Sequence, residues 1–187
     1  TKVWTSGKEE GISQMNQSFG KMRTDKMDLM QVHNLVDVHT HLKTLRSWKD
    51  QGKIKYFGIT HYVPSAYPEM MSLIKTEKPD FVQCCYNIAT RDAEKELLPL
   101  AKEKGIAVLI NRPFEEGNLF NVVKGHAVPS WAKEYGIASW AQFFLKFIIS
   151  HSAVTCTIPG TSKALHLEDN LRAATGTLPD EKTRNKM

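Results

Sequence analysis

Short apolar segments alternate with segments of helical periodicity along the whole chain, and this alternation limits the possible folds more than any other feature. The apolar segments are typical of β-strands and cover residues 2–5, 27–33, 54–62, 81–86, 106–111 and 154–158. The segments between them repeat apolar residues at three- and four-residue spacing, which predicts helices at residues 11–19, 38–51, 66–78, 93–104, 140–148 and 164–174. The chain is therefore expected to be an α/β protein.

Local signals support several of these helix boundaries. Gly52 follows the second helix and is expected to end it in a left-handed turn. Ser139 and Gln142 form a Ser-x-x-Gln capping box, which predicts a helix start at that point. The aromatic stripe of residues 140–148 is interpreted as core and not as a cofactor-binding surface.

The predicted strands are apolar throughout, which indicates a parallel sheet with helices packed outside it. Five complete strand–helix units follow a first partial one. We expect residues 1–187 to form a single domain of the (β/α)₈ barrel type, incomplete, although a doubly wound open sheet would give the same alternation.

Composition excludes several functional classes. The net charge is +5, but the lysines and arginines are scattered and no basic run carries interleaved aromatic residues, so no nucleic-acid partner is expected. No apolar run approaches the roughly 20 residues that span a bilayer, so no membrane partner is expected. A site for a local anionic ligand, together with solvated helix faces, accounts for the charge.

The three cysteines predict free thiols. Cys84, Cys85 and Cys156 are odd in number and fit no disulfide framework. Adjacent residues of a strand point to opposite faces, so Cys84 and Cys85 are expected to do so. Thiols in apolar segments indicate small core residues in a reducing compartment, and a cytoplasmic location is expected. A reactive thiol is the alternative, and no cysteine or histidine has zinc-site spacing, so no metal is expected.

Polar and basic residues follow the apolar strands where each strand ends. They are Lys2, His33, Asn34, Thr60, His61, Gln83, Asn111, Arg112, Pro159, Gly160 and Thr161. The carboxyl ends of parallel strands in a barrel meet at one mouth, where binding residues collect. The sequence therefore predicts a small-molecule site at that mouth.

Motifs in a fixed order resemble the aldo-keto reductase family. They are TKVW at residues 1–4, DLMQVH at 28–33, GITHY at 58–62, Gln83, IPGT at 158–161 and HLEDN at 166–170. The resemblance covers nearly the whole chain, from the family's third barrel strand to its C-terminal helices, so the chain would hold about the last five to six βα units. It implies an NADP(H)-dependent oxidoreductase that reduces the carbonyl of a small aldehyde or ketone to an alcohol.

The resemblance implies two catalytic residues. Lys2 matches the family's active-site lysine, which lowers the pKa of a neighbouring tyrosine so that the tyrosine can protonate a carbonyl oxygen. His33 matches the active-site histidine, which orients the substrate carbonyl. Without the resemblance, Lys2 would be interpreted as a surface lysine and His33 as a hydrogen-bonded core histidine.

The resemblance also implies a set of cofactor-binding residues. Thr60, His61 and Gln83 match positions that hold the nicotinamide carboxamide. The loop of Asn111, Arg112, Pro113 and Phe114 matches the segment along the ring and the pyrophosphate. The adenosine 2′-phosphate and adenine positions are matched by Gly160, Thr161, Ser162, Lys163, His166, Asp169 and Asn170. A helix start beside Thr161, Ser162 and Lys163 is a phosphate site on physical grounds alone.

The sequence also departs from the family pattern. The family's catalytic tyrosine and its aspartate partner lie upstream of the lysine strand, in a segment that this chain does not contain. Asn111 stands where many members have an aromatic residue, His61 replaces a usual asparagine, and His166 replaces a usual arginine. Proton donation would then need a substitute such as Tyr62, His33 or water. The alternative function is a truncated chain that binds NADP(H) with little or no turnover.

An incomplete barrel leaves strand edges without a partner. The strands at residues 2–5 and 154–158 would each lack one neighbour, so we expect a homo-oligomer formed through these edges.

Other residues have structural interpretations. Gln83 could hydrogen-bond inside the barrel, and Tyr86 and Trp131 could line a pocket or pack in the core. His39 and His41 are interpreted as surface residues, because their spacing on a helix is poor for metal ligation.

Overall fold

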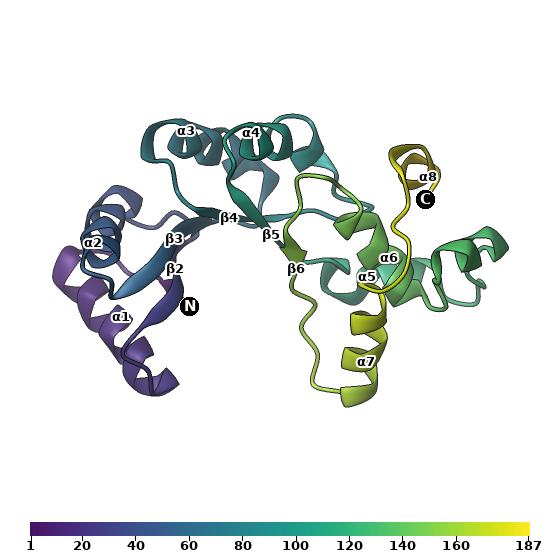
Figure 1. Ribbon diagram of the computed structural model, residues 1–187, viewed down its shortest axis with the longest axis horizontal. Helices are drawn as coiled ribbons and strands as arrows, with labels where there is room; N and C mark the ends of the chain where they lie inside the picture. The colour runs from purple at the N-terminus through teal and green to yellow at the C-terminus, as the bar shows by residue number, and fades with distance from the viewer.

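The computed structural model describes residues 1–187 and contains one six-stranded parallel sheet (Figure 1). Its strands are β1 (Lys2–Val3), β2 (Met27–His33), β3 (Ile54–Thr60), β4 (Phe81–Cys85), β5 (Ala107–Asn111) and β6 (Cys156–Thr157). Each strand pairs in parallel with the next one in the chain. The predicted parallel sheet is confirmed.

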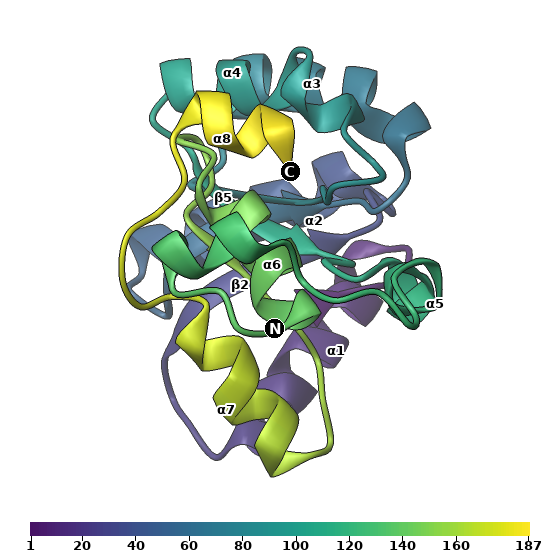
Figure 2. The same ribbon diagram turned by 90° about the vertical axis from the view of Figure 1, so that its right-hand side faces the viewer.

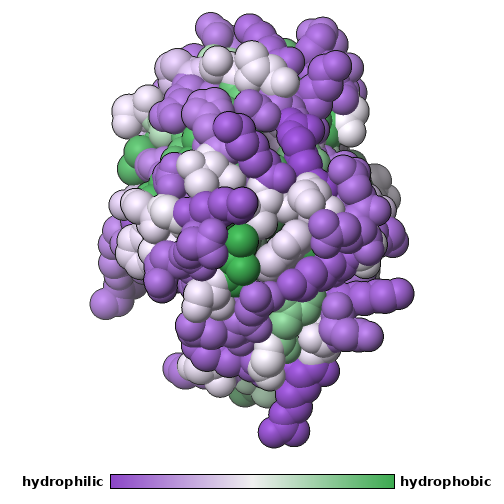
Figure 3. Space-filling model, turned by 90° about the vertical axis from the view of Figure 1, so that its left-hand side faces the viewer, coloured by the Kyte–Doolittle hydropathy of each residue, from purple (hydrophilic) through white to green (hydrophobic).

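The helices are α1 (Lys8–Met22), α2 (Val38–Asp50), α3 (Tyr67–Glu77), α4 (Leu97–Glu103), α5 (Asn118–Val122), α6 (Trp140–Ile149), α7 (Ala164–Arg172) and α8 (Glu181–Lys186). Short 3₁₀ helices lie at Pro64–Ala66, Asp92–Glu94, Glu115–Gly117 and Ser130–Tyr135. The sheet is arched, and α1 to α4 lie along its outer side (Figure 1). The surface that carries α1 and α2 is largely hydrophilic, as expected for the outer face of amphipathic helices (Figure 3).

The strand order identifies the type of α/β fold. A doubly wound sheet reverses its order at a switch point, whereas this sheet runs from β1 to β6 without reversal. Sequential parallel strands with helices outside are the arrangement of a (β/α)₈ barrel. The sheet is an open arc in which β1 pairs only with β2 and β6 only with β5.

Alternate residues of each strand face the two sides of the sheet. One set packs against the helices in the main hydrophobic core and consists of Met30, Val32, Phe57, Ile59, Val82, Cys84, Val108 and Ile110. By the two-residue repeat of a strand, the intervening side chains face the concave side. These include Gln31, His33, Thr60, Gln83 and Asn111. Cys84 and Cys85 therefore lie on opposite faces, as predicted.

Two predicted helix-end signals are present. Gly52 adopts a φ of +70° after α2, and the backbone N–H groups of Gly52 and Lys53 donate to the carbonyls of Lys49 and Trp48, each at 2.9 Å. At the start of α6, the Ser139 hydroxyl accepts a 3.1 Å hydrogen bond from the Gln142 backbone N–H. The Gln142 side chain accepts from Ala138 N instead of Ser139 N, so the capping box is shifted by one residue.

Several element boundaries differ from the predictions. The strand expected at residues 2–5 ends at Val3, and the one expected at 154–158 is confined to Cys156–Thr157, because each is an edge strand with one partner to define its ladder. The charged segment of α8 has no apolar periodicity, so sequence patterning missed it.

Two burial predictions were wrong. His41 is fully buried, since its ring packs against Gly11 of α1 and its Nε2 lies 2.7 Å from the Thr5 carbonyl. His39 is exposed as predicted. Cys156 is exposed, because its strand lies at the open edge of the sheet, whereas Cys84 and Cys85 are buried.

The C-terminal segment is fastened to the barrel by buried polar contacts. Figure 2 shows the chain leaving α7 and crossing the molecule to α8. Lys146 of α6 is buried and donates to the carbonyls of Thr175 at 2.7 Å and Thr177 at 3.0 Å. Arg184 of α8 is also buried, and its guanidinium donates to the carboxylate of Glu94. The helices of this fold include none that is both long enough and apolar enough to cross a bilayer.

Candidate active site

Three of the predicted site residues form one row across the concave face. His33 is the register partner of Thr60, and Thr60 is the register partner of Gln83. Thr60 and Gln83 are each nearly fully buried, whereas His33 is partly exposed. Because parallel strands in register present their side chains side by side, the sheet brings these three residues together. Tyr86, by contrast, is buried in the main hydrophobic core between the sheet and the helices, so it lines no part of this site.

Lys2 lies next to this row, at the start of β1. It is the register partner of Gln31, two residues before His33 on the same face of β2. Burial lowers the pKa of Lys2 below its ordinary value. Trp4 packs edge-on against the His33 ring, with ring centroids 5.2 Å apart, and helps to fix the imidazole.

The surroundings of His33 lower its pKa, which keeps the imidazole neutral near pH 7. Burial lowers the pKa of His33, and the nearby charges of Lys2 and His61 lower it further. Burial also lowers the pKa of His61, against the opposing effect of Glu69. Lys2, His33 and His61 thus lie close enough for the charges of Lys2 and His61 to lower the pKa of His33.

The side chain of Arg112 joins the loop after β5 to the loop after β3. Its guanidinium carbon lies 4.6 Å from the centre of the Tyr62 ring, and Tyr62 in turn stacks on His61. β4 lies between these two strands in the sheet, so Arg112 spans the carboxyl end of β4. Arg112 also pairs with the carboxylate of Glu116. The predicted nicotinamide-side and pyrophosphate-side residues are thus in contact through one cation.

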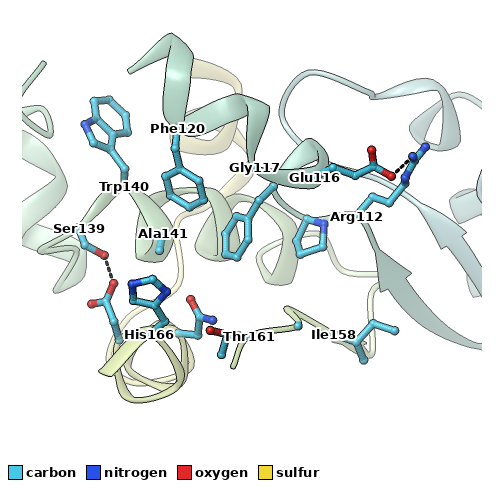
Figure 4. A pocket seen from close by; sticks show the side chains of 15 residues that line it. Arg112, Glu116, Gly117, Phe120, Ser139, Trp140, Ala141, Ile158, Thr161 and His166 are labelled. Atoms are coloured by element: carbon cyan, nitrogen blue, oxygen red, sulfur yellow. Dashed lines mark hydrogen bonds and ion pairs between the residues drawn. The ribbon is translucent and has the colours of Figure 1, made fainter. Parts of the chain in front are cut away.

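A cavity of about 710 Å³ opens beside Arg112 and is called here the β5–α7 cavity (Figure 4). The predicted cofactor residues that line it are Arg112, Pro113, Phe114, Gly160, Thr161, His166, Asp169 and Asn170. Figure 4 shows Arg112 and Glu116 at one end of this cavity and His166 at the other. Its volume is in the range of small-molecule sites.

Other predicted residues lie outside the cavity. Ser162 and Lys163 are exposed at the start of α7, where Lys163 is the N-cap and its backbone N–H donates to the Thr161 hydroxyl at 3.2 Å. Six further predicted site residues lie on the concave face or at its rim and not on the cavity wall. They are Lys2, His33, Thr60, His61, Gln83 and Asn111. The site therefore has two parts, which meet at Arg112.

Asp169 has a structural partner that the sequence did not reveal. Its carboxylate accepts hydrogen bonds of 2.6 Å each from the Ser139 hydroxyl and the Gln142 side-chain amide. These contacts fasten α7 to the first turn of α6. Asp169 therefore shapes the cavity wall, and its carboxylate oxygens are already hydrogen-bonded.

Sequence reasoning missed part of the cavity wall, namely Glu116, Gly117, Phe120, Ser139, Trp140, Ala141 and Ile158. Trp140 and Ala141 belong to the stripe interpreted as core, and that interpretation holds for Phe143 and Phe144 but not for these two residues. The sequence signal was present for Trp140, since the first turn of a helix is less covered than its middle. For the residues of α5 and of the loop before it, the sequence held no pattern that would have placed them on a cavity wall.

The loop after β5 has an unusual backbone. Arg112, Glu115 and Glu116 have φ values of 52°, 47° and 55°, and Gly117 has a φ of 96°. Positive φ is unfavourable for residues other than glycine, so the loop needs external contacts to hold it.

A buried polar network supplies these contacts. The Glu115 carboxylate accepts from the Asn87 amide at 2.6 Å and from the Thr90 hydroxyl at 2.5 Å. The same Asn87 amide donates to the Arg112 carbonyl at 3.0 Å. The loop after β4 thereby fixes the backbone of the loop that carries Arg112.

The residues present fit a dinucleotide. The Asn111 side-chain oxygen is buried without a hydrogen-bond partner, which leaves an acceptor free beside Arg112. Arg112 offers a guanidinium, and Thr161 and Asn170 offer hydrogen-bonding groups on the cavity wall. A cationic group at one end and polar groups at the other suit an elongated anionic ligand.

Comparisons with known proteins agree with this arrangement. A relative from Escherichia coli (strain K12), methylglyoxal reductase YeaE, is 25% identical over 89% of this chain and 60% of its own length. The NADH-specific methylglyoxal reductase of the same organism is 27% identical over 76% of this chain and 46% of its own length. The chain thus spans about half the length of these relatives.

The fold also matches solved structures. The aldo/keto reductase from Klebsiella pneumoniae in complex with NADP and acetate superimposes with a TM-score of 0.80, at 23% identity, over 99% of this chain and 66% of the other. The sequence model of the aldo/keto reductase family matches residues 1–185. Together with the barrel order of the strands, this match means that the chain belongs to the aldo/keto reductase family.

Proposed function

We propose that this protein is an NADP(H)-dependent oxidoreductase that reduces the carbonyl of a small aldehyde or ketone to an alcohol. The observation that carries the proposal is the placement of Lys2 beside Gln31 and of His33 two residues further along the same face of β2, on the concave side of the sheet next to the β5–α7 cavity. Membership of the family and the methylglyoxal reductases among its relatives support it.

Lys2 and His33 would act on the carbonyl oxygen. A neutral imidazole carries one N–H group that can donate a hydrogen bond to this oxygen. The ammonium group of Lys2 would stabilise the negative charge that develops there during reduction, and a water molecule would supply the proton that converts this oxygen into a hydroxyl. Burial strengthens this effect, because the charge of Lys2 is less screened by water.

The remaining concave residues would orient the reacting ring. Thr60, His61 and Gln83 would hold a carboxamide, since a hydroxyl, an imidazole and an amide offer both donors and an acceptor. Asn111 and Arg112 would contact the ring and the pyrophosphate, beside Pro113 and Phe114. When bound, the nicotinamide cofactor supplies the hydride that reduces the carbonyl carbon.

The far end of the cavity would bind the adenosine part. The residues assigned to it are Gly160, Thr161, Ser162, Lys163, His166, Asp169 and Asn170. Lys163 provides a cation at the rim for a 2′-phosphate, whereas Asp169 would act by shaping the wall. The free thiols accord with a cytoplasmic location for this chemistry.

A second candidate function is NADP(H) binding with little or no turnover by a self-associating chain. The observation in its favour concerns the five tyrosines of the chain. The hydroxyl of Tyr67 donates to the Cys85 carbonyl, and that of Tyr86 donates to the Glu94 carboxylate. Burial raises the pKa of both hydroxyls far above their ordinary range. No tyrosine of this chain hydrogen-bonds to Lys2.

Oxidation of NADPH in the presence of methylglyoxal separates the two candidates. The loss of NADPH absorbance is followed with and without the aldehyde, and cofactor binding is measured on the same preparation. Reduction of the aldehyde, greatly slowed by Lys2→Met, supports the reductase. Binding of NADPH without aldehyde-dependent oxidation supports the second candidate, and absence of binding contradicts both.

A further inference from the structure

The β5–α7 cavity offers an anionic ligand a single permanent cation, and that cation is already paired with a carboxylate. The wall holds one permanent cation, Arg112, and two carboxylates, Glu116 and Asp169. Asp169 is hydrogen-bonded to Ser139 and Gln142, as described above. Glu116 has a single polar partner, which is Arg112 itself.

Arg112 is also held by contacts that do not involve Glu116. Its carbonyl is held by the Asn87 amide at 3.0 Å, and its guanidinium lies 4.6 Å from the Tyr62 ring centre. Neutralising Glu116 would therefore leave the cation in place at the end of the cavity, with its charge no longer balanced.

We propose that Glu116 limits the affinity of the β5–α7 cavity for anionic ligands by occupying Arg112. Figure 4 shows the two side chains paired at the end of the cavity. A pyrophosphate group that reaches the guanidinium must share it with a carboxylate and is repelled by that carboxylate. Glu116 is thus a specificity-determining residue that weakens binding of the phosphate-bearing part of a ligand. This inference rests on the proposed function for the identity of the ligand, but not for the charge effect.

The exposure of the pair sets the size of the effect. The Glu116 side chain is 66% exposed, so water and salt screen its charge. Removing it should therefore tighten anion binding by about three- to fivefold at low salt. The gain should shrink as salt is added.

The test compares Glu116→Gln with the wild-type chain by calorimetric titration of NADP⁺, NAD⁺ and inorganic pyrophosphate. Glu103→Gln is the matched control, because Glu103 is 67% exposed and pairs with Lys104. Glu103 lies outside the cavity wall, so its substitution should change none of the three affinities. The expected result is tighter binding of all three ligands by Glu116→Gln alone, with a larger gain at low salt.

Other outcomes overturn the inference. Weaker dinucleotide binding by Glu116→Gln would mean that the carboxylate contacts the ligand, and unchanged binding would mean that it has no effect. If the wild-type chain binds pyrophosphate but neither dinucleotide, the proposed function fails, and the pyrophosphate affinities still decide the role of Glu116. If neither the wild-type chain nor Glu116→Gln binds pyrophosphate, the inference is wrong, because a freed Arg112 should attract it.

Discussion

His33 and Thr60 are register partners at the carboxyl ends of β2 and β3, so their side chains lie side by side on the concave face of the sheet. The pairing is set by backbone hydrogen bonds along the ladder and not by contacts between the two side chains. A site built in this way is as rigid as the sheet that carries it.

Lys2→Met should raise the pKa of His33. Burial and the charges of Lys2 and His61 together lower this pKa, and the substitution removes one of the two cations. NMR titration of the imidazole measures the change, and Lys8→Met on the exposed start of α1 is the control that should leave it unaltered. A His33 pKa that does not move in Lys2→Met would contradict the proximity described here.

The lowered pKa of His33 also predicts that the stability of the fold depends on pH. The folded-state pKa of His33 lies below its unfolded value of about 6.5, so the unfolded chain binds more protons just below that pH. The contribution of His33 therefore destabilises the fold as the pH falls from about 6.5 through the folded pKa.

Substitution of Gln83 should reduce turnover per bound cofactor more than it weakens cofactor binding. Its buried amide is expected to align the nicotinamide, and loss of alignment raises the barrier to hydride transfer. Gln83→Ala and Gln83→Leu should share this defect, of about tenfold or more, although the leucine variant keeps more of the packing. A collapse of affinity with unchanged turnover would show that the assignment is wrong.

Arg184→Met should destabilise the fold by about 1.5–3 kcal/mol, because the largely buried carboxylate of Glu94 loses one of its two cationic partners and keeps only Arg91. The free energy of unfolding in urea measures the effect. Lys182→Met, an exposed substitution on the same helix, should change it little.

The loss caused by Arg184→Met should also depend on pH. Burial opposes ionisation of Glu94, but hydrogen bonds from Tyr86, Arg91 and Arg184 outweigh it and hold its pKa below the ordinary value. The stabilisation is therefore fully present above about pH 5 and fades as the pH falls through the folded pKa of Glu94. A loss in Arg184→Met that is equal at neutral and acidic pH would contradict this explanation.

The 187-residue chain should self-associate through its open strand edges. β1 and β6 have one strand partner each, and Trp4 and Ile158 are exposed beside them. Light scattering at micromolar concentration should detect assemblies larger than a monomer. Cys156→Lys places a charge on the β6 edge and should reduce the assembled fraction. A folded monomer that unfolds cooperatively would contradict the prediction.

Much of the fold could be predicted, because it depends on short-range patterns. Apolar runs and helical repeats located β2 to β5 within two residues at either end. The edge strands were less well predicted, since their length depends on a neighbour and not on composition. α8 depends on the burial of Arg184 against Glu94, a contact between distant residues that no local pattern encodes.

The candidate site was predictable to the extent that it lies on strand ends. His33, Thr60 and Gln83 follow from strand boundaries, whereas Glu116 and Phe120 do not. The loop that carries Glu116 and leads into α5 has positive φ values at three residues other than glycine, and the network of Asn87, Thr90 and Glu115 holds that conformation. His41 was misjudged for a similar reason, because its burial depends on the space left by Gly11.

The dissociation constants of NADPH and NADH test the central claim most directly. We predict that NADPH binds about three- to tenfold more tightly, since Thr161, Ser162 and Lys163 at the start of α7 favour a 2′-phosphate but His166 replaces the usual arginine. Lys163→Met should remove most of the difference while leaving NADH binding unchanged. Equal constants, or tighter binding of NADH, would contradict the assignment of this site to NADP(H).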